Sequence, residues 1–394
     1  MPGCRATSPG TRRAERPGGH FSPPGVLAGV LVCAALFAVI PVGRAEPVEL
    51  PVPDGVLPPE IPADNPPTAE KVALGRKLYF DRRISTDGTV ACATCHDPRH
   101  AFVDPRGTPT SAGVGGALGT RNAPTVLNAA FLSSQFWDGR APTLEEQAVQ
   151  PLINPIEHGF PDHDAVVARI REIGEYEGLF EAAFGSPEIT PRRIGQAIAS
   201  FERTLISLEA PIDRFLAGQT DAISPAARRG WKLFNGKARC NNCHGHVGAF
   251  PLFTDDDFHN IGVGVDQIDF ARVAAEAAAA IRSGASLDSL ALTDREASEL
   301  GRFLVTGEPR HLGAFKTPQL RNVALTAPYM HDGSEATLRD VIDFYDRGGN
   351  PNPYLDGGMR PLGLTEQEKD DLVELLRTFT SDDLDRFRDL AEQP

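Results

Sequence analysis

The hydrophobic positions of this chain recur mainly with the spacing of amphipathic helices. Apolar residues return every three or four positions in the stretches 194–205, 338–345 and 372–376, which places one side of each helix against a core. No stretch alternates apolar and polar residues convincingly enough to predict a strand. The pattern therefore predicts an all-α fold.

Helix starts are marked by capping residues. Thr190-Pro191 and Ser224-Pro225 each pair a capping hydroxyl with proline at the first helical position. Thr365 begins a capping box before a further helix. Long stretches rich in Gly, Pro, Asn and Asp separate the helices, and we expect them to be ordered loops on a helical core; they are 46–67 (an exposed, extended arm), 103–125, 245–266 and 346–363.

The length of the chain favours two domains. A weak internal repeat agrees, because residues 75–80 read GRKLYF and residues 230–234 read GWKLF, each within an amphipathic helix. We predict an N-terminal domain over 46–208 and a C-terminal domain over 209–394. The Ala-rich segment 271–300 is expected to be a helical insertion in the second domain, without an assigned function.

Residues 1–45 have the features of a signal peptide. Arginines precede an apolar run over 26–40, and Gly43-Arg44-Ala45 supplies small residues for cleavage. The run is too short for a comfortable membrane span. We expect the mature chain to begin near Glu46 and to be exported to the periplasm, with Cys4 and Cys33 removed.

The charge of the chain limits its partners. The segment 1–45 holds five Arg and one Glu, so its removal takes the formal charge from −14 to −18. A strongly acidic protein is a poor ligand for nucleic acids and anionic membranes. The charge would suit a basic electron-donor protein, and it is equally compatible with a merely soluble exported protein.

The pattern Cys-x-x-Cys-His occurs twice, at 92–96 and 240–244. It is the attachment pattern of c-type haem, in which two thiols bond to one porphyrin and the adjacent His ligates the iron. A zinc site or a thioredoxin-like pair fits poorly, because His follows each pair directly and no further Cys pair completes a zinc cage. We predict two covalent haem c groups, held by Cys92, Cys95 and His96 and by Cys240, Cys243 and His244.

Longer motifs follow the first haem motif. They are RNAPTVLN at 121–128, FWDGR at 136–140, EEQA at 145–148, NPIE at 154–157, LRNVALTAPY at 320–329 and HDG at 331–333. With them the chain resembles the bacterial di-haem cytochrome c peroxidase and MauG family over nearly all of its length after residue 45. The resemblance implies two cytochrome-c-like domains, reduction of hydrogen peroxide at the N-terminal haem, and electron transfer through the C-terminal haem.

The resemblance also implies roles for three residues between the haems. Glu157 matches the family's distal acid–base glutamate, Gln147 its partner, and Trp137 the tryptophan between the haems. Cleaving the O–O bond needs a group that moves a proton between the peroxide oxygens. Taken without the flanking motifs, a solvated Glu and a core Trp are the plain alternatives.

A calcium site between the haems is implied in the same way. Asn122 matches a ligand that binds through its side-chain oxygen, and Thr326 and Pro328 match ligands that bind through main-chain carbonyls. Oxygen ligands with several waters suit calcium. The alternative is ordinary hydrogen bonding within loops.

Two departures from the standard peroxidases concern the iron ligands. Val114 stands where a loop histidine caps the N-terminal haem at rest, so we expect that iron to be five-coordinate or to hold water. Tyr345 stands where the second haem has its methionine ligand. MauG has tyrosine there, and tyrosinate stabilises ferric and higher iron states. Met359 and Met330 are rival ligands, and a core role for Tyr345 is the plain alternative.

Three functions follow, in decreasing order of support. A MauG-like enzyme would store two oxidising equivalents across its haems and oxidise side chains of a partner protein. An ordinary cytochrome c peroxidase would take electrons from a small cytochrome or cupredoxin. A non-enzymatic electron carrier would need closed, six-coordinate iron and no acid–base Glu. Ala238 replaces a surface tryptophan of MauG, which argues against the same exit route and the same quinone-forming substrate.

Overall fold

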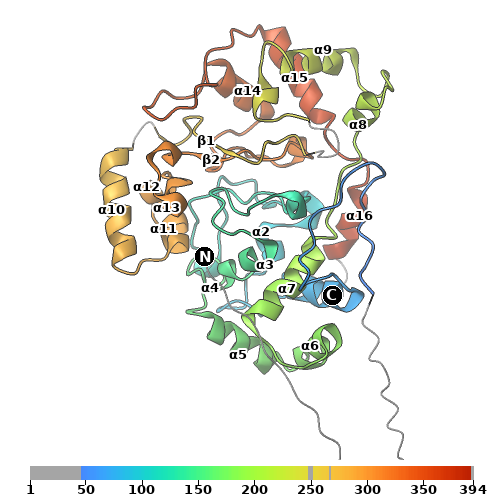
Figure 1. The fold of residues 1–394 in the computed structure, drawn as a ribbon, viewed down its shortest axis with the longest axis vertical. Coiled ribbons are helices and arrows are strands. Elements are labelled where there is room, and N and C mark those ends of the chain that lie inside the picture. Colours follow the sequence, from blue (N-terminus) through green and yellow to red (C-terminus); the bar gives the residue numbers. More distant parts are fainter. Residues whose placement is uncertain (1–45, 247–251, 266–267, 392–394) are drawn as a thin grey trace, which may run out of the picture. The chain divides into compact units, whose positions relative to one another are not determined.

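The structure, a computed structural model, describes residues 46–246, 252–265 and 268–391 (Figure 1). The predicted signal peptide, with Cys4 and Cys33, lies outside the described residues. The described residues all belong to one compact unit. None of their helices combines the length and the hydropathy needed to cross a bilayer.

The chain is largely helical, as the apolar spacing predicts. The α-helices are α1 (Ala69–Phe80), α2 (Cys92–Cys95), α3 (Leu144–Gln147), α4 (Gln150–Ile153), α5 (His163–Ile173), α6 (Tyr176–Phe184), α7 (Pro191–Glu202), α8 (Pro211–Leu216), α9 (Pro225–Phe234), α10 (Phe270–Arg282), α11 (Leu287–Thr293), α12 (Arg295–Ser298), α13 (Phe303–Thr306), α14 (Leu338–Asp346), α15 (Glu366–Arg377) and α16 (Asp385–Arg388). Single 3₁₀ turns occur at Pro98–His100, Val114–Gly116, Ala129–Phe131, Cys240–Asn242, Pro309–His311, Val323–Leu325 and Asp389–Ala391.

Two short strands differ from the sequence-based expectation. β1 (Phe258–His259) pairs antiparallel with β2 (Phe315–Lys316), and His259 lies opposite Phe315. Two residues are too few to show an alternating pattern, so periodicity could not reveal these strands.

The predicted helix starts are confirmed. The hydroxyl of Thr190 accepts from the backbone of Arg193 at the start of α7, and α9 begins with the same device at Ser224. Thr365 and Glu368 form the predicted capping box at α15. The segment 271–300 is helical, but it is divided among α10, α11 and α12, and α10 and α11 contribute to a third apolar cluster.

The arm over 46–67 is extended but only partly exposed. Leu50, Val52 and Val56 pack against an apolar cluster formed with residues 206–208 and 252, whereas Leu57 is 66% exposed. The expectation of an exposed arm is therefore wrong in part, because burying these three side chains removes apolar surface from water and Asn65, near the end of the arm, is fully buried.

Two helix pairs, α1 with α7 and α9 with α15, organise the two halves of the chain. Each pair meets at a glycine. A Cβ on Gly75 would lie 1.8 Å from the carbonyl oxygen of Ala197, and one on Gly230 would lie 2.1 Å from that of Asp371. Each pair belongs to a separate apolar cluster. In the stretch between α7 and α8, Leu205 still belongs to the first cluster and Ala210 already belongs to the second. The division at 208/209 into two domains remains a prediction.

A loop after each haem motif has similar backbone at several corresponding positions in the two halves, and we call residues 124–143 and 318–337 the repeated loop. Asn128 and Asn322 both adopt left-handed backbone, with φ of 60° and 59°. Each side-chain oxygen accepts from a backbone N–H, that of Ser207 at 2.7 Å and that of Ser381 at 2.9 Å. The sequence repeat at the leading helices therefore extends into the loops.

The repeated loop places one ring from each half at corresponding positions. Phe136 and Met330 again share left-handed backbone, with φ of 68° and 72°. Trp137 and His331 follow them directly, and each copy then ends at a Thr that caps the next helix, α3 or α14. The ring centroids of Trp137 and His331 lie 6.5 Å apart, edge to face.

The C-terminal segment returns to the N-terminal half (Figure 1). Phe387 of α16 packs edge-on against Phe102, with ring centroids 5.7 Å apart. Phe102 lies just beyond the first haem motif, so the end of the chain helps to bury the surroundings of that motif.

Candidate di-haem active site

The first haem motif orients its histidine through the backbone. His96 follows α2, and its Nδ1 lies 3.3 Å from the carbonyl oxygen of Phe102. A hydrogen bond at Nδ1 leaves Nε2 as the atom for iron. Burial lowers the pKa of His96, which favours the neutral imidazole that a metal requires.

The second motif repeats this arrangement. Nδ1 of His244 lies 3.0 Å from the carbonyl oxygen of Phe253, and burial lowers the pKa of His244 as well. The four cysteines of the two motifs are free of disulfides. Both motifs therefore fit covalent haem c, with the cysteines available for thioethers and one nitrogen of each imidazole available for iron.

A largely apolar cavity of about 320 Å³ opens beside the second motif. Cys240, Cys243 and His244 line it, and so do Tyr345 from α14 and Met359 from the following loop. Burial raises the pKa of Tyr345, and the thiols of Cys243 and Cys240 raise it further. The tyrosine thus shares one cavity with the motif, although the rival Met359 and Met330 line that cavity too.

The same cavity contains the predicted inter-haem tryptophan and the predicted calcium ligands. Trp137, Asn122, Thr326 and Pro328 all line it. The indole N–H of Trp137 donates to the backbone oxygen of Asn122 at 2.9 Å, and the Asn122 amide nitrogen donates to Pro109. The side-chain oxygen of Asn122 and the two carbonyls are the kind of donors that calcium prefers.

His331 is held by a carboxylate from the inserted segment. Its Nε2 lies 2.7 Å from Oε2 of Glu299, and both side chains are buried. Its ring stacks on Phe315 with centroids 3.5 Å apart. Because Glu299 occupies Nε2, the structure agrees with a packing role near the second motif and offers no support for iron ligation.

Glu157 is a buried acid in a tight turn near the first motif. The residue as a whole is half-buried, but its Oε2 is closed off from solvent and has no hydrogen-bond partner among the described residues. Burial is the main cause that raises the pKa of Glu157; with a smaller upward contribution from Asp288 and a downward one from Arg140, the pKa is about 8. Its charge in turn raises the pKa of both motif thiols, Cys92 and Cys95.

The remaining predicted residues around Glu157 are placed as follows. Val114 donates its backbone N–H to the carbonyl oxygen of Glu157 at 3.1 Å, so the loop that lacks the capping histidine lies on the Glu157 turn. Gln147 ends α3 and is half-buried, and it makes no hydrogen bond to Glu157 within the described part of the chain.

Sequence reasoning missed several charged groups near the motifs. The buried Oε2 of Glu202 in α7 has no hydrogen-bond partner among the described residues, and burial raises the pKa of Glu202 to about 8. Burial also raises the pKa of Cys92, and the charge of Glu202 adds to that rise. Asp288 and Arg140 flank Glu157. No local pattern marks Glu202 or Asp288, and Arg140 is visible in the sequence only as the last residue of the FWDGR motif, without a role near Glu157.

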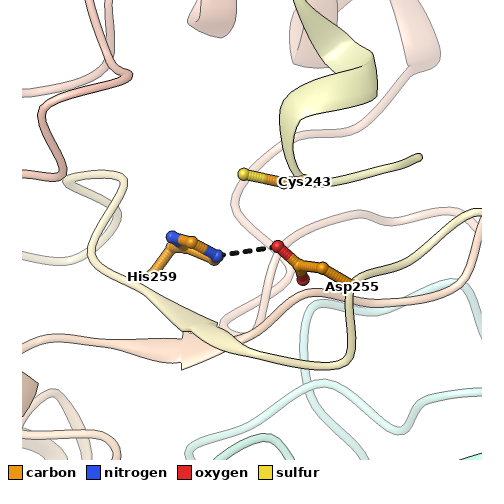
Figure 2. Close-up of side chains that lie close together, drawn as sticks. All are labelled: Cys243, Asp255 and His259. Atoms are coloured by element: carbon orange, nitrogen blue, oxygen red, sulfur yellow. Dashed lines mark hydrogen bonds and ion pairs between the residues drawn. The ribbon is translucent and has the colours of Figure 1, made fainter.

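A histidine also lies against the second motif. Figure 2 shows Cys243, Asp255 and His259, whose ligand atoms all lie within 4.8 Å of one another. Hydrogen bonds to Asp255 and Cys243 raise the pKa of His259 to about 11; burial opposes them, and Asp356 makes a smaller contribution in the same upward direction. Because Cys243 belongs to the haem motif, we interpret the group as a hydrogen-bonded support for that motif and not as a separate metal site.

Comparisons with known proteins agree with this geometry. The model of the di-haem cytochrome c peroxidase family matches residues 69–221. The chain is 39% identical to the methylamine utilization protein MauG of Methylorubrum extorquens, over 82% of this chain and 81% of that protein. It is 37% identical to the cytochrome-c peroxidase IdrP1 of Denitromonas iodatirespirans, over 90% of this chain and 92% of that protein.

A solved structure is similar as well. A MauG-like protein associated with microbial copper homeostasis superposes with a TM-score of 0.70 at 35% identity, over 86% of this chain and 97% of that one. The relatives include both MauG proteins and cytochrome c peroxidases. The chain therefore belongs to the di-haem cytochrome c peroxidase family that includes MauG, and it is an oxidoreductase that acts on peroxide.

Proposed function

We propose that this protein is a periplasmic, MauG-like di-haem peroxidase that passes both oxidising equivalents of hydrogen peroxide to a partner protein. Cys92, Cys95 and His96 would hold the peroxidatic haem. Cys240, Cys243 and His244 would hold the second haem, with Tyr345 as its other iron ligand. When bound, the haem groups supply the redox chemistry, and a calcium ion at Asn122, Thr326 and Pro328 would fit the oxygen donors there.

Glu157 would handle the proton at the peroxidatic site. A carboxyl group whose pKa lies near the working pH can both accept and return a proton, and the pKa of Glu157 is about 8. Its Oε2 has no partner among the described residues, so it can bind a substrate oxygen without first breaking a bond. Valine at position 114 cannot ligate iron, which supports an open site at rest.

The observation that carries the MauG-like assignment is the position of Tyr345. It lines the cavity of the second motif together with Cys240, Cys243 and His244. A tyrosinate ligand stabilises oxidised iron. Trp137 lines the same cavity, and its indole would support electron transfer between the haems.

The alternative is an ordinary cytochrome c peroxidase, and one observation favours it. Met359 lines the same cavity as Tyr345, and a methionine ligand raises the haem potential. Such an enzyme would draw single electrons from a small cytochrome or a cupredoxin. A carrier without enzymatic activity is disfavoured by family membership.

Donor-free peroxide oxidation tests the proposal. The fully oxidised holoprotein is mixed with one equivalent of hydrogen peroxide, and any unreacted peroxide is removed. A reduced redox dye is then titrated in to count the oxidising equivalents that the protein has kept. A MauG-like enzyme retains close to two oxidising equivalents per protein after the peroxide is gone. If no equivalent is retained and turnover occurs only with a reduced cytochrome or cupredoxin, the ordinary peroxidase assignment is correct.

A further inference from the structure

The inserted segment contributes one carboxylate, that of Asp288, to the surroundings of the Glu157 turn (residues 154–159). Asp288 is the second residue of α11, and its side chain is 19% exposed. Its Oδ1 accepts from Arg140 at 2.6 Å (Nη2) and 3.1 Å (Nε). Its Oδ2 accepts from the amide nitrogen of Asn154 at 2.6 Å. One carboxylate therefore joins two residues that are close to each other and to Glu157.

Asn154 forms the turn that presents Glu157. Its side-chain oxygen accepts from the backbone of Ile156 at 3.0 Å. Its carbonyl oxygen accepts from the backbone N–H groups of Glu157 at 3.2 Å and Gly159 at 2.9 Å. The amide nitrogen is the remaining polar atom of this side chain, and Asp288 binds it. The hydrogen bond to Asp288 thus completes the hydrogen bonds of Asn154, which together orient the turn.

Arg140 is the second group that Asp288 holds. Its side chain is only 3% exposed and lies between Asp288 and the fully buried Asp138. Its guanidinium also covers the ring of Phe136 at 3.5 Å. The carboxylates of Asp138 and Asp288 and the ring of Phe136 restrict the guanidinium to one position, so the place of its positive charge near Glu157 is well defined.

The inserted segment is anchored independently of Asp288. Thr120 donates its hydroxyl to the carbonyl oxygen of Ala291 at 2.8 Å, and Arg121 donates to that of Ser298 at 2.9 Å. Ile156, from the Glu157 turn itself, packs on the segment's apolar cluster. Changing Asp288 alone should therefore leave the segment in place.

We propose that Asp288 is a positioning residue of the peroxide reaction, and that the inserted segment, 271–300, completes the peroxidatic site by supplying it. Through Asn154 it orients the turn that carries Glu157, and through Arg140 it fixes the positive charge beside that carboxyl. The inference rests on the proposed role of Glu157, and it assigns a function to an insertion that sequence analysis left without one.

The charges around Glu157 give the proposal a second readout. Burial raises the pKa of Glu157, Asp288 adds to this effect, and Arg140 opposes it. The neighbouring His158 has its pKa lowered by burial, so it adds no positive charge near neutral pH. Neutralising Asp288 should therefore lower the pKa of Glu157, and the pH midpoint of the peroxide reaction should move to lower pH.

Asp288→Asn is the primary test, because asparagine offers one acceptor oxygen where aspartate offers two and cannot serve both Arg140 and Asn154. We expect both haems to remain attached and the peroxide reaction to slow roughly 10- to 100-fold, the scale of a misplaced catalytic group. The backbone amides of Glu157 and Gly159 should exchange hydrogen faster. Glu276→Gln, an exposed acid of the same segment that pairs only locally with Arg272, is the matched control and should change none of these.

A swapped pair tests the hydrogen bond apart from the charge. In the Asp288→Asn/Asn154→Asp double variant, an amide and a carboxylate again face each other. In this double variant, slow hydrogen exchange of the Glu157 and Gly159 backbone amides should return. The double variant also keeps the proposal testable if the single variant Asp288→Asn fails to bind haem. Unchanged rate, midpoint and exchange in Asp288→Asn would overturn the proposal.

Glu157→Gln, measured in parallel, separates the two levels of inference. If Glu157→Gln slows the reaction and Asp288→Asn does not, only the role of Asp288 fails. If Glu157→Gln has no effect, the proposed function of the site fails first.

Discussion

The two halves of this molecule share one backbone design and fill it differently. In both, a helix pair meets at a glycine, a Cys-x-x-Cys-His motif has its imidazole bound to a backbone carbonyl, and the repeated loop follows. In the first half the loop presents Trp137, and in the second it presents His331. The shared parts are therefore those that would hold a haem.

The halves diverge at the helix that follows the repeated loop. α3 ends after four residues, and the chain then forms α4 and the turn that presents Glu157. α14 continues for nine residues and carries Tyr345 into the cavity beside the second motif. In the proposed assignment, the interrupted helix is followed by the turn that carries the acid Glu157, whereas the continuous helix carries the proposed iron ligand Tyr345. The length of one helix thus separates the predicted reactive site from the predicted closed site.

The largest expected effect is the loss of one haem at a time. Cys92→Ala with Cys95→Ala should remove the N-terminal haem and leave the second one attached, because each motif has its own cysteines and histidine. The reverse holds for the pair Cys240 and Cys243. Mass spectrometry of the denatured protein counts the haems. If the mass of the wild-type protein included fewer than two haems, the two halves would not both be haem-binding units.

Glu157→Gln should slow the peroxide reaction by roughly 100-fold or more, the scale of a lost proton-transfer group. Both haems should remain attached. Glu202→Gln is a matched control, since Glu202 is also buried with an unpartnered oxygen and a pKa of about 8. Stopped-flow absorbance measures both variants. If Glu157→Gln and Glu202→Gln slowed the reaction equally, the rate would depend on the presence of a buried carboxyl group and not on the position of Glu157.

Val114→His should make the first half resemble the closed second half. The backbone of Val114 lies on the Glu157 turn, so an imidazole at this position is near the reactive site. Electron paramagnetic resonance of the oxidised wild type should show one high-spin and one low-spin ferric haem, and the variant should require prior reduction before it reacts. Two low-spin signals in the wild type would rule out an open site at rest.

Tyr345→Phe should have the smallest effect on initial peroxide binding. It should alter the low-spin spectrum of the second haem and shorten the lifetime of the two-equivalent oxidised state, because phenylalanine offers no ligand atom. Met359→Leu is its counterpart in the same cavity and should leave that spectrum unchanged. The opposite pattern would identify Met359 as the ligand and favour an ordinary cytochrome c peroxidase.

Local patterns in the sequence determined much of this protein. Capping residues marked the starts of α7, α9 and α15, and two five-residue motifs indicated the haem sites, because each pattern depends on residues a few positions apart. The longer motifs identified the family, which the comparisons confirm. β1 and β2 escaped notice because two residues show no period.

Only the tertiary structure decided which charges surround the predicted acid. Asp288 lies 134 residues from Asn154 and 148 from Arg140 along the chain, and no spacing rule connects such positions. The same holds for Glu299, which reaches His331 from 32 residues away. Hydrogen bonds and pKa values depend on distance in space and on burial, so they emerge only when the inserted segment packs against the turn.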